Sequence, residues 1–595
     1  MNWKRTPHPV RALLALGLAG LLSVLGGRMA HAATQPVQSH SPPAAGETAT
    51  VDTAGRVLAT LVAVAAQPTA ATPVYRADIP GTRIFLPLVQ DFVFTSHRDT
   101  YQTYEGAVTC LRCHEDQARQ VHDSVHYQWF GPTPDVPDLD GGGKLGGIND
   151  FCGFPDINFI GQMVNLDGET VDGGCATCHV GMGARPQAEA TDAELANIDC
   201  LVCHSPTYRR KVEAVDGGFR FVPAPERMDV PEIDAITDVQ KPTDENCLAC
   251  HVNAGGGDNN KRGDIESTHA DPPSAHFDVH MAPRELGGAG LGCLDCHVVE
   301  DHHIAGRGTD LRATDLDVPV ACTNCHPSTP HDDSRLNEHT ARVDCATCHI
   351  PSFAKVVSTE MDRDYREAEV VEAKRLYEPK MTRQSNVTPA YVFDNGTSDF
   401  YEFGTPITLG PNGRVVMATP LGSIQDDGAK IIPVKHHTAT QPVDLSTNRL
   451  IPVKLGLLFQ TGDPDAAIVA GATAMDWPLD AGYDFVGTER YMGIYHEVAP
   501  ASEALACDTC HGVDAARLDF AALGYTPKDE RNGRPLCLSC HGYEDDQEEW
   551  GDRFFYEVHN EHVGGGGDDD LAAAGVNDGH IACSECHTFS AATTQ

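Results

Sequence analysis

The sequence lacks a long apolar segment beyond its N-terminus, and it is poor in basic residues. After the first thirty residues no stretch stays apolar for the roughly 18 residues that a membrane-spanning helix needs. The 43 lysines and arginines are outnumbered by 85 aspartates and glutamates, which gives a formal net charge of −42. This charge disfavours nucleic acid as a partner, and it repels small anions unless local cations hold them. We therefore expect no transmembrane segment in the mature chain and no nucleic-acid partner.

The cysteines follow one pattern almost without exception. Twenty of the 21 occur in ten C-x-x-C-H motifs, and Cys152 alone stands outside them. We name each motif by its first cysteine. In chain order the motif residues are Cys110, Cys113 and His114; Cys175, Cys178 and His179; Cys200, Cys203 and His204; Cys247, Cys250 and His251; Cys293, Cys296 and His297; Cys322, Cys325 and His326; Cys345, Cys348 and His349; Cys507, Cys510 and His511; Cys537, Cys540 and His541; Cys583, Cys586 and His587.

This spacing suits covalent attachment of haem c. Two thiols at positions i and i+3 reach the two vinyl groups of a porphyrin, and the next histidine then falls beneath the iron as proximal ligand. Zinc ribbons and disulfide frameworks do not require that histidine, and iron–sulfur runs need a third and a fourth nearby cysteine. The sequence therefore predicts ten covalently bound haem c groups.

Ten haems in 595 residues leave only about 60 residues for each cofactor. The hydrophobic content is ordinary at 41%, so the porphyrins themselves must form much of the core. Frequent glycines and prolines favour short helices after the motifs and long irregular connections. We expect a multihaem cytochrome c of mainly short α-helices and irregular loops packed around haems, with a small haem-free region containing β-hairpins.

Composition divides the chain into five parts. Residues 1–32 read as a signal peptide, with basic, apolar and small-residue segments in order, which predicts a periplasmic or extracellular protein. Residues 33–75 are rich in Ala, Pro and Thr and read as a flexible linker. Residues 76–360 hold seven motifs, 361–500 form a haem-free insertion, and 501–595 hold the last three motifs.

Two local patterns refine this division. The insertion opens with a charged segment at 361–378, which we expect to be helical, whereas the runs at 391–396 and 431–437 predict short strands. Among the motifs, the shortest separations favour direct haem contact between the Cys175 and Cys200 motifs and between the Cys322 and Cys345 motifs.

The histidines suffice to saturate every iron. Of the 29 histidines, ten are proximal and two, His8 and His31, lie in the predicted signal peptide, which leaves seventeen for ten distal positions. An iron with histidine on both sides has no position for a substrate and can only transfer electrons. An enzyme would need an exception to this ligation.

Several stretches outside the motifs form a specific ordered series. They are INDFC at 148–152, QKPTDENCLACH at 240–251, GGGDNNKRGD at 255–264, DVHM at 278–281, HHIAGR at 302–307, LNEHTARVDCATCHIP at 336–351, HEVAPA at 496–501 and RLDFAALGY at 517–525. Together with the motifs, this series resembles the octahaem tetrathionate reductases. The resemblance runs from about His97 to Gly524 and covers eight of the ten motifs.

In that family the second haem carries a distal lysine and is the active site, while the other haems are bis-histidine and deliver electrons. The resemblance therefore implies catalysis at the haem of the Cys175 motif, with His179 and Lys241 as iron ligands. A lysine ligates only as the neutral amine, so burial or the metal must drive the loss of its proton. The implied distal ligands of the other seven family haems are His97, His126, His280, His302, His331, His339 and His496.

The Cys537 and Cys583 motifs lie beyond the family region. They read as a fused module through which electrons pass to or from the rest of the protein. The distal ligands available to these two extra haems are His559, His562 and His580.

The resemblance also implies a role for Cys152, the cysteine outside the motifs. The family places this cysteine beside the lysine-ligated haem, where cationic groups and a metal acidify a thiol. We expect Cys152 to take part in handling a sulfur substrate, through a transient persulfide or S-thiosulfate adduct.

The resemblance implies a multi-electron reductase, with tetrathionate as the substrate and thiosulfate as the product. Reduction of nitrite or hydroxylamine is the enzymatic alternative, and a non-catalytic electron conduit is the alternative from another class. Redox proteins or quinol-linked cytochromes are the expected electron donors. Candidate cations for holding a small anionic substrate are Lys144, Arg185, Lys261 and Arg262.

Overall fold

The computed structural model describes part of the chain. The described residues are 96–128, 135–136, 150–151, 153–306, 315–511, 517–527, 530–531, 534–535 and 587–589. The chain divides into two units after Phe92, and all of the described residues belong to the second unit. The predicted features that lie outside the described residues are the signal peptide, the linker, Lys144, Cys152, the cysteines of the last two motifs, His541, His559, His562 and His580.

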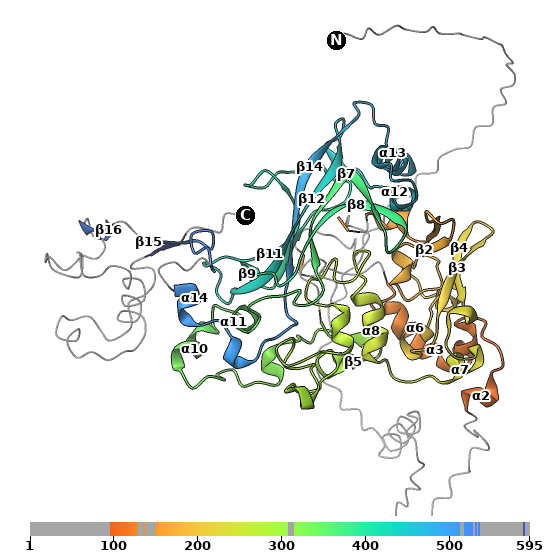
Figure 1. The fold of residues 1–595 in the computed structure, drawn as a ribbon, viewed down its shortest axis with the longest axis horizontal. Helices are drawn as coiled ribbons and strands as arrows, with labels where there is room; N and C mark the ends of the chain where they lie inside the picture. The colour runs from red at the N-terminus through yellow and green to blue at the C-terminus, as the bar shows by residue number, and fades with distance from the viewer. Residues whose placement is uncertain are drawn as a thin grey trace, which may run out of the picture. The chain divides into compact units, whose positions relative to one another are not determined.

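Short helical segments carry the motifs (Figure 1). In a helical turn, residues i and i+3 lie on one face, so both thiols of a motif can reach the same porphyrin edge. We expected helices after the motifs, whereas in most cases the turn is formed by the motif itself. These segments are α3 (Val108–Asp123), η2 (Cys175–Thr177), α6 (Leu201–His204), α8 (Asp244–His251), α9 (Cys293–Cys296), η6 (Cys322–Asn324), α11 (Cys345–His349) and α14 (Cys507–His511).

The connections between these turns contain further short elements. The helices are α2 (His97–Thr100), α4 (Pro155–Asn158), α5 (Asp192–Ala196), η3 (Pro225–Arg227), α7 (Glu232–Thr237), η4 (Ser267–Ala270), η5 (Arg284–Leu286), α10 (Ser334–His339) and η7 (Ala501–Glu503). The two-stranded hairpins are β1 (Gly161–Val164) with β2 (Thr170–Gly173), β3 (Arg210–Val215) with β4 (Gly218–Pro223), and β5 (Val299–Glu300) with β6 (His303–Ile304). Two more pairs lie near the C-terminus: β15 (Tyr525–Pro527) with β18 (His587–Phe589), and β16 (Glu530–Arg531) with β17 (Arg534–Pro535).

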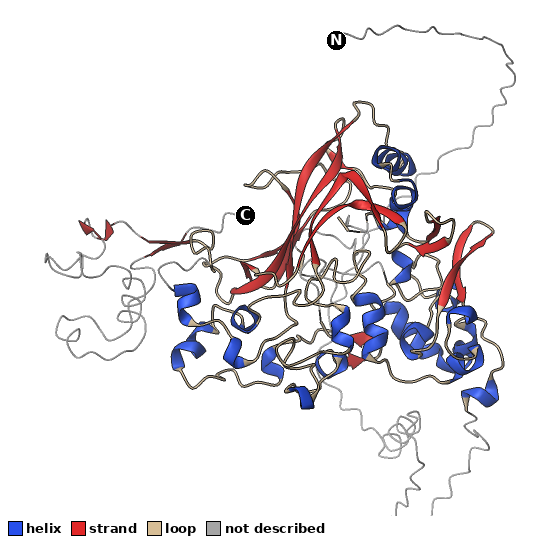
Figure 2. Cartoon of the chain, in the orientation of Figure 1, coloured by secondary structure: helices blue, strands red, loops and turns tan. Residues whose placement is uncertain are grey.

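The range predicted to be a haem-free insertion folds as one large twisted sheet (Figure 2). Within the described residues this sheet has eight strands. Its main path runs β10 (Thr397–Phe400), β11 (Val415–Leu421), β14 (Tyr483–Gly493), β12 (Lys430–Asp444), β7 (Thr359–Val371) and β8 (Leu376–Gln384), while β9 (Ala390–Asp394) and β13 (Arg449–Leu450) also pair with β12. The β11–β14 and β12–β7 pairs are parallel, so this region is larger and more interwoven than the small set of hairpins that we expected.

The helix predicted at 361–378 is wrong. These residues form most of β7, a tight turn and the start of β8, which pair as an antiparallel hairpin. The dense charge suggested a solvated helix, but several of these charges pair across or along the hairpin. Glu367 meets Lys380 on the opposite strand at 2.9 Å, and Glu360 meets Arg363 at 2.7 Å inside the protein. The strands predicted at 391–396 and 431–437 are present as β9 and part of β12.

One side of the sheet packs against two helices, α12 (Leu455–Thr461) and α13 (Pro464–Ala474). Leu458 and Ile468 from these helices are fully buried against Tyr365 of β7 and Ile451, which follows β13. A Cβ atom on Gly471 would lie 1.7 Å from the carbonyl oxygen of Pro452. Only glycine therefore allows α13 to approach this segment so closely.

Among the residues that the structure describes, no helix is both long and apolar enough to cross a membrane.

Candidate functional site

Histidines from distant parts of the chain face one another in pairs. Each pair joins the histidine of one motif to one of the histidines named above as distal. In six such pairs of the described residues, the ring centroids lie 6.1–6.4 Å apart. The pairs are His114 with His97, His204 with His302, His251 with His126, His297 with His496, His326 with His280, and His349 with His331.

This spacing fits an iron atom between two imidazoles. Bonds of about 2 Å from a metal to two facing ring nitrogens leave the ring centroids about 6 Å apart. Within the described residues, no group of three or more His, Cys, Asp or Glu side chains could hold a metal ion by itself. Paired axial imidazoles beside two thiols are the donor set that a haem requires, because the porphyrin supplies the remaining iron ligands.

A two-residue turn presents one of these histidines. Asp301 and His302 join β5 to β6, and both have positive φ angles, 48° and 67°. This is the geometry of a type I′ turn, which matches the twist of a tight hairpin but strains a residue other than glycine. The ring of His302 lies opposite that of His204, and its Nδ1 is 2.8 Å from Oε1 of Gln120. The hairpin thus holds the imidazole in place at the cost of local strain.

Other pairs are oriented in the same way, by a hydrogen bond at Nδ1 that leaves Nε2 available for a metal. Nδ1 of His204 lies 2.8 Å from the backbone oxygen of Gln240, and Nδ1 of His297 lies 2.9 Å from that of Ala305. A Cβ atom on Gly306, whose φ is 123°, would lie 3.0 Å from Nδ1 of His297. A glycine after Ala305 therefore keeps the space beside this ring open.

Burial keeps many of the paired rings in the neutral form that binds metals. It lowers the pKa of His251 to about 4, and the neighbouring His126 ring acts in the same direction. Burial, followed by the charge of the partner ring, also lowers the pKa of His97 and of His302. Only a neutral imidazole offers a lone pair to iron.

The thiols show which motifs adjoin. None of the sixteen cysteines that the structure describes forms a disulfide, and several from different motifs lie near one another. The following thiols lie close enough to interact with each other: Cys110 with Cys200, Cys178 with Cys250, Cys247 with Cys293, and Cys322 with Cys345. Electrostatic interaction places further pairs near each other: Cys203 with Cys247, Cys296 with Cys325, and Cys348 with Cys510.

These contacts arrange the described motifs in a row with a side branch. The row runs through the Cys110, Cys200, Cys247, Cys293, Cys322, Cys345 and Cys507 motifs in that order. The Cys175 motif adjoins the row at the Cys247 motif, through Cys178 and Cys250. Direct haem contact between the Cys175 and Cys200 motifs and between the Cys322 and Cys345 motifs stays a prediction, and the nearness of the Cys322 and Cys345 thiols supports the second pair.

Arg210 of β3 holds the Cys175 motif. Its guanidinium donates to the backbone oxygens of Ala176 at 3.1 Å and His179 at 3.3 Å, and it lies 3.9 Å from the centre of the Phe221 ring. It also pairs at 3.1 Å with the fully buried carboxylate of Asp199, which directly precedes the Cys200 motif. We did not single out Arg210 in the sequence, because nothing near it in the chain marks it as part of this site.

Lys241 precedes α8, the helix of the Cys247 motif that adjoins the Cys175 motif. Gln240, the residue before it, donates its N–H to the backbone oxygen of His204 at 2.9 Å, and its own oxygen lies 2.8 Å from Nδ1 of that histidine. The chain at Lys241 is therefore fixed between two adjoining motifs. Its exposed side chain makes no hydrogen bond or ion pair to the described residues.

A buried ionic cluster holds the two residues that precede Cys152. The Asp150 carboxylate receives hydrogen bonds from Arg490 at 2.6 Å and from His437 at 2.9 Å, and all three side chains are almost fully buried. His437 also lies 3.2 Å from the Glu360 carboxylate, and the centre of its ring lies 4.2 Å from that of Phe151, with the two rings tilted by 33°. The structure thus gives His437 a role in holding the chain that precedes Cys152.

The cluster extends through Glu360. Two bonds of 2.7 Å join its carboxylate to Arg363, which also donates to the backbone oxygen of Phe151. Tyr365 donates to the backbone oxygen of Asp150 at 2.7 Å. Nearby, Lys435 donates to the backbone oxygen of Asn260 at 2.7 Å, and burial lowers its pKa to about 7. Strands of the sheet thus fix Asp150 and Phe151.

The proposed anion-holding cations have partners of their own. Arg185 pairs with Asp156, and Arg262 pairs with Asp264 at 3.3 Å. Lys261 is half-buried next to Arg262, and its backbone oxygen accepts a bond from Lys435. His339 ends α10, six residues before the Cys345 motif begins on α11.

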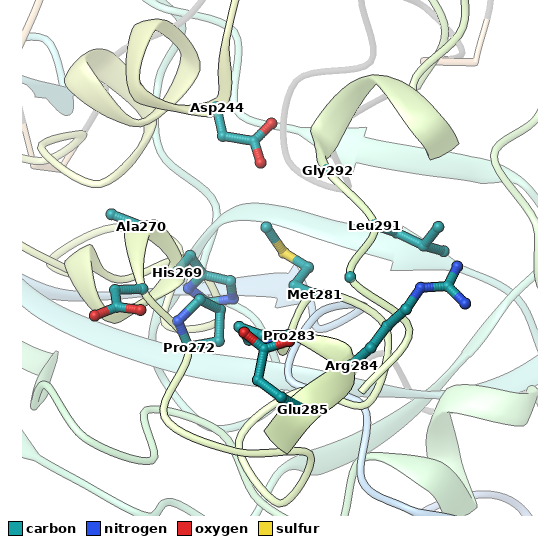
Figure 3. A pocket seen from close by; sticks show the side chains of 12 residues that line it. Asp244, His269, Ala270, Pro272, Met281, Pro283, Arg284, Glu285, Leu291 and Gly292 are labelled. Atoms are coloured by element: carbon teal, nitrogen blue, oxygen red, sulfur yellow. The ribbon is translucent and has the colours of Figure 1, made fainter. Parts of the chain in front are cut away.

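A cavity of about 440 Å³ lies beside the Cys293 motif (Figure 3). Its lining includes His269, Met281, Arg284 and Leu291, and it ends at Gly292, the residue before Cys293. Asp244 at the start of α8 also lines it and accepts a 2.8 Å bond from the backbone N–H of Cys293.

The family described as Cytochrome c bacterial matches residues 359–514, a range that begins with β7 and ends just after the Cys507 motif. A solved structure, the octahaem cytochrome c from Shewanella oneidensis, superposes with a TM-score of 0.58 at 29% sequence identity. The match covers 74% of this chain and 99% of that chain.

Two curated relatives also match. An uncharacterized protein from Archaeoglobus fulgidus is 35% identical, over 35% of this chain and 77% of that protein. Cytochrome c-type protein NrfB from Escherichia coli O6:H1 is 35% identical over 10% of this chain, and the match spans only 38% of NrfB.

Motif spacing, paired imidazoles and these matches define the class of the protein. It is a multihaem c-type cytochrome, with covalently bound haem c and a redox role. Within that class, the chain belongs to the same family as the Archaeoglobus fulgidus protein.

Proposed function

We propose that the protein is an exported decahaem reductase, in which bis-histidine haems supply electrons to a haem held by His179 and Lys241. The row of motifs with one side branch is the observation that carries this proposal. A haem with histidine on both sides of its iron can only pass electrons on. A haem on the branch, with a more readily displaced amine as its distal ligand, can open its iron to a substrate. Bound haem would supply one-electron transfer, and the ligands that the protein provides would determine which haem binds the substrate.

The six facing ring pairs support this assignment of ligands. They account for the Cys110, Cys200, Cys247, Cys293, Cys322 and Cys345 motifs. We assign His339 to the haem of the Cys507 motif, and Lys241 to that of the Cys175 motif. Arg210 supports the second assignment, because its bonds to the backbone of Ala176 and His179 fix the proximal side of this haem.

Tetrathionate is the proposed substrate. Two electrons break its central S–S bond and release two thiosulfate anions, and no proton is consumed. Adjacent motifs allow the second electron to be held next to the site until it is needed. We assign Cys152 to the handling of the sulfur substrate, and the cluster around Asp150 and Phe151 supports this by anchoring the chain that leads to it. Export to the periplasm or the cell exterior, with redox proteins or quinol-linked cytochromes as donors, completes the proposal.

Turnover of tetrathionate, nitrite and hydroxylamine with a low-potential donor tests the substrate. We expect tetrathionate turnover, with two thiosulfates formed for each tetrathionate consumed. Turnover of nitrite or hydroxylamine alone would replace the substrate but keep the enzyme. If none of the three turns over and cyanide binds to none of the haems, the protein is a conduit.

Lys241→Ala and Lys241→His test the ligand assignment. We expect Lys241→His to convert one haem to bis-histidine spectra and to lower turnover at least 100-fold, because the iron is then saturated. Lys211→Ala is the matched control, since Lys211 forms an exposed ion pair with Glu226 at 2.8 Å. Cys152→Ala is expected to slow tetrathionate turnover with all ten haems in place.

A further inference from the structure

Asp264 sits behind one of the paired histidines. Its Oδ2 lies 3.1 Å from Nδ1 of His496, the ring that faces His297 of the Cys293 motif at 6.2 Å. The two rings are nearly parallel, with an angle of 21° between their planes. The carboxylate is fully buried, so water does not screen its interaction with the ring.

The surroundings of Asp264 keep its carboxylate ionised. Oδ2 also accepts hydrogen bonds from the backbone N–H groups of Tyr495 at 2.9 Å and His496 at 3.2 Å. Oδ1 accepts one from Nε of Arg262 at 3.3 Å. Every contact is therefore with a donor, and none calls for a proton on the carboxylate.

At four other paired rings the acceptor within hydrogen-bond distance of Nδ1 is neutral, and at His280 the Asp278 carboxylate lies 3.9 Å from Nδ1, beyond that distance. Nδ1 of His204 and of His297 face backbone oxygens of Gln240 and Ala305. Nδ1 of His302 faces the side-chain amide of Gln120 at 2.8 Å, and that of His331 faces the amide of Asn337 at 3.3 Å. A carboxylate in this position draws the Nδ1 proton away from the ring more strongly than an amide oxygen does.

We propose that Asp264 is a tuning residue, which gives His496 partial imidazolate character and lowers the reduction potential of the haem of the Cys293 motif. A more basic axial ligand stabilises the ferric state, because it donates more electron density to the iron. The negative charge of the carboxylate acts in the same direction. This inference rests on the bis-histidine ligation proposed above.

The position of the haem of the Cys293 motif indicates what a lowered reduction potential would do. The Cys293 motif lies in the middle of the row, between the Cys247 and Cys322 motifs. A low-potential haem there divides the row into two parts, one of which includes the branch at the Cys175 motif. Electrons that have crossed toward the branch return slowly, so that part of the row holds a pair of electrons ready for a two-electron reduction.

Two substitutions test the tuning in opposite directions. In a potentiometric titration of the full ten-haem protein followed by EPR, Asp264→Asn is expected to shift the reduction equilibrium of one low-spin haem about tenfold toward the ferrous state, or about 59 mV for one electron. Arg262→Gln is expected to shift the same haem toward the ferric state, because it removes the cation that draws electron density from Asp264.

Gln120→Glu provides the reverse experiment at another haem. It places a carboxylate beside Nδ1 of His302, and it is expected to shift the haem of the Cys200 motif toward the ferric state by a similar factor. Haem content and the total low-spin EPR signal report whether each variant is intact, and damage from misfolding would move Asp264→Asn and Arg262→Gln in the same direction. If the reduction potential of no single haem shifts in the intact Asp264→Asn protein, the tuning is refuted. The proposed function is tested separately, by turnover and by the Lys241 variants.

Discussion

Around the motifs, the helices bury few side chains of their own. Helix α8 buries only Leu248, and the described turns α9 and η6 bury none. In the sheet, by contrast, β12 buries most of its fifteen residues, and Tyr365, Leu458 and Ile468 form a packed apolar core. The same chain therefore contains a region whose interior is left for cofactors and a region whose interior is filled with side chains.

This difference shows how a multihaem cytochrome can still present a precise site. The motif region has only small apolar clusters of its own, such as that of Ala118, Tyr127, Leu195 and Ile198, and attached porphyrins would add to its core. The sheet has a larger core of side chains, and its buried ions fix Asp150 and Phe151. The rigid core of the sheet thus lets the sheet position residues beside the motif region.

Removal of a haem from the middle of the row is the largest perturbation. Cys247→Ser with Cys250→Ser removes the motif that adjoins those at Cys175, Cys200 and Cys293. We expect loss of one haem by mass spectrometry and rapid proteolysis between residues 200 and 300, while fragments that contain the sheet survive. The same change at Cys507 and Cys510, at the end of the described row, is expected to leave residues 200–300 protected. If residues 200–300 and the sheet resist proteolysis in both variants, the motif region does not depend on its haems more than the sheet does.

Breaking the buried ion pair of the sheet is the next largest effect. Glu360→Gln leaves Arg363 charged and unpaired inside the protein, which costs about 3–5 kcal/mol of the free energy of unfolding. Denaturant unfolding of the haem-loaded protein, followed by far-UV circular dichroism, measures the change. Glu367→Gln is the matched control on the same hairpin, because Glu367 meets Lys380 in the open, and we expect no measurable loss there. Equal losses in the two variants would contradict the assigned role of Glu360.

Acidification should lower the free energy of unfolding of the sheet by less than the Glu360→Gln substitution does. Burial alone would raise the pKa of the Glu360 carboxyl, but Arg363 and His437 outweigh it and lower the pKa to about 2 from 4.5. Because the folded value is depressed, this carboxyl stabilises the fold above pH 4.5, and the contribution is lost as the pH falls toward 2. The loss is on the order of 1–3 kcal/mol. Stability measured against pH should show this loss in the parent protein, and Glu360→Gln should lack it.

The sequence alone was enough to predict the cofactor class. A covalent haem needs fixed residue types at fixed spacing, and such a requirement can be read without a fold. The facing ring pairs are different, because they join residues far apart in the chain, such as His126 with His251 and His297 with His496. Only the resemblance to a family, and not the residues themselves, pointed to those partners.

The missed features share a cause as well. The segment at 361–378 is charged because its charges pair across a hairpin and within a buried cluster, and charge density cannot tell a solvated helix from such a strand. Arg210 and Asp264 matter through backbone oxygens and ring nitrogens that they reach only in the folded chain. Tertiary contacts of this kind leave no local pattern in a sequence.

The neighbouring thiols also impose an order on biosynthesis. Cys110 lies near Cys200, Cys178 near Cys250, and Cys322 near Cys345 in the folded chain. In an oxidising compartment such neighbours would close into disulfides between motifs and trap the chain without haem. The chain must therefore be kept open until each motif has received its porphyrin, so that covalent loading comes first and folding completes it.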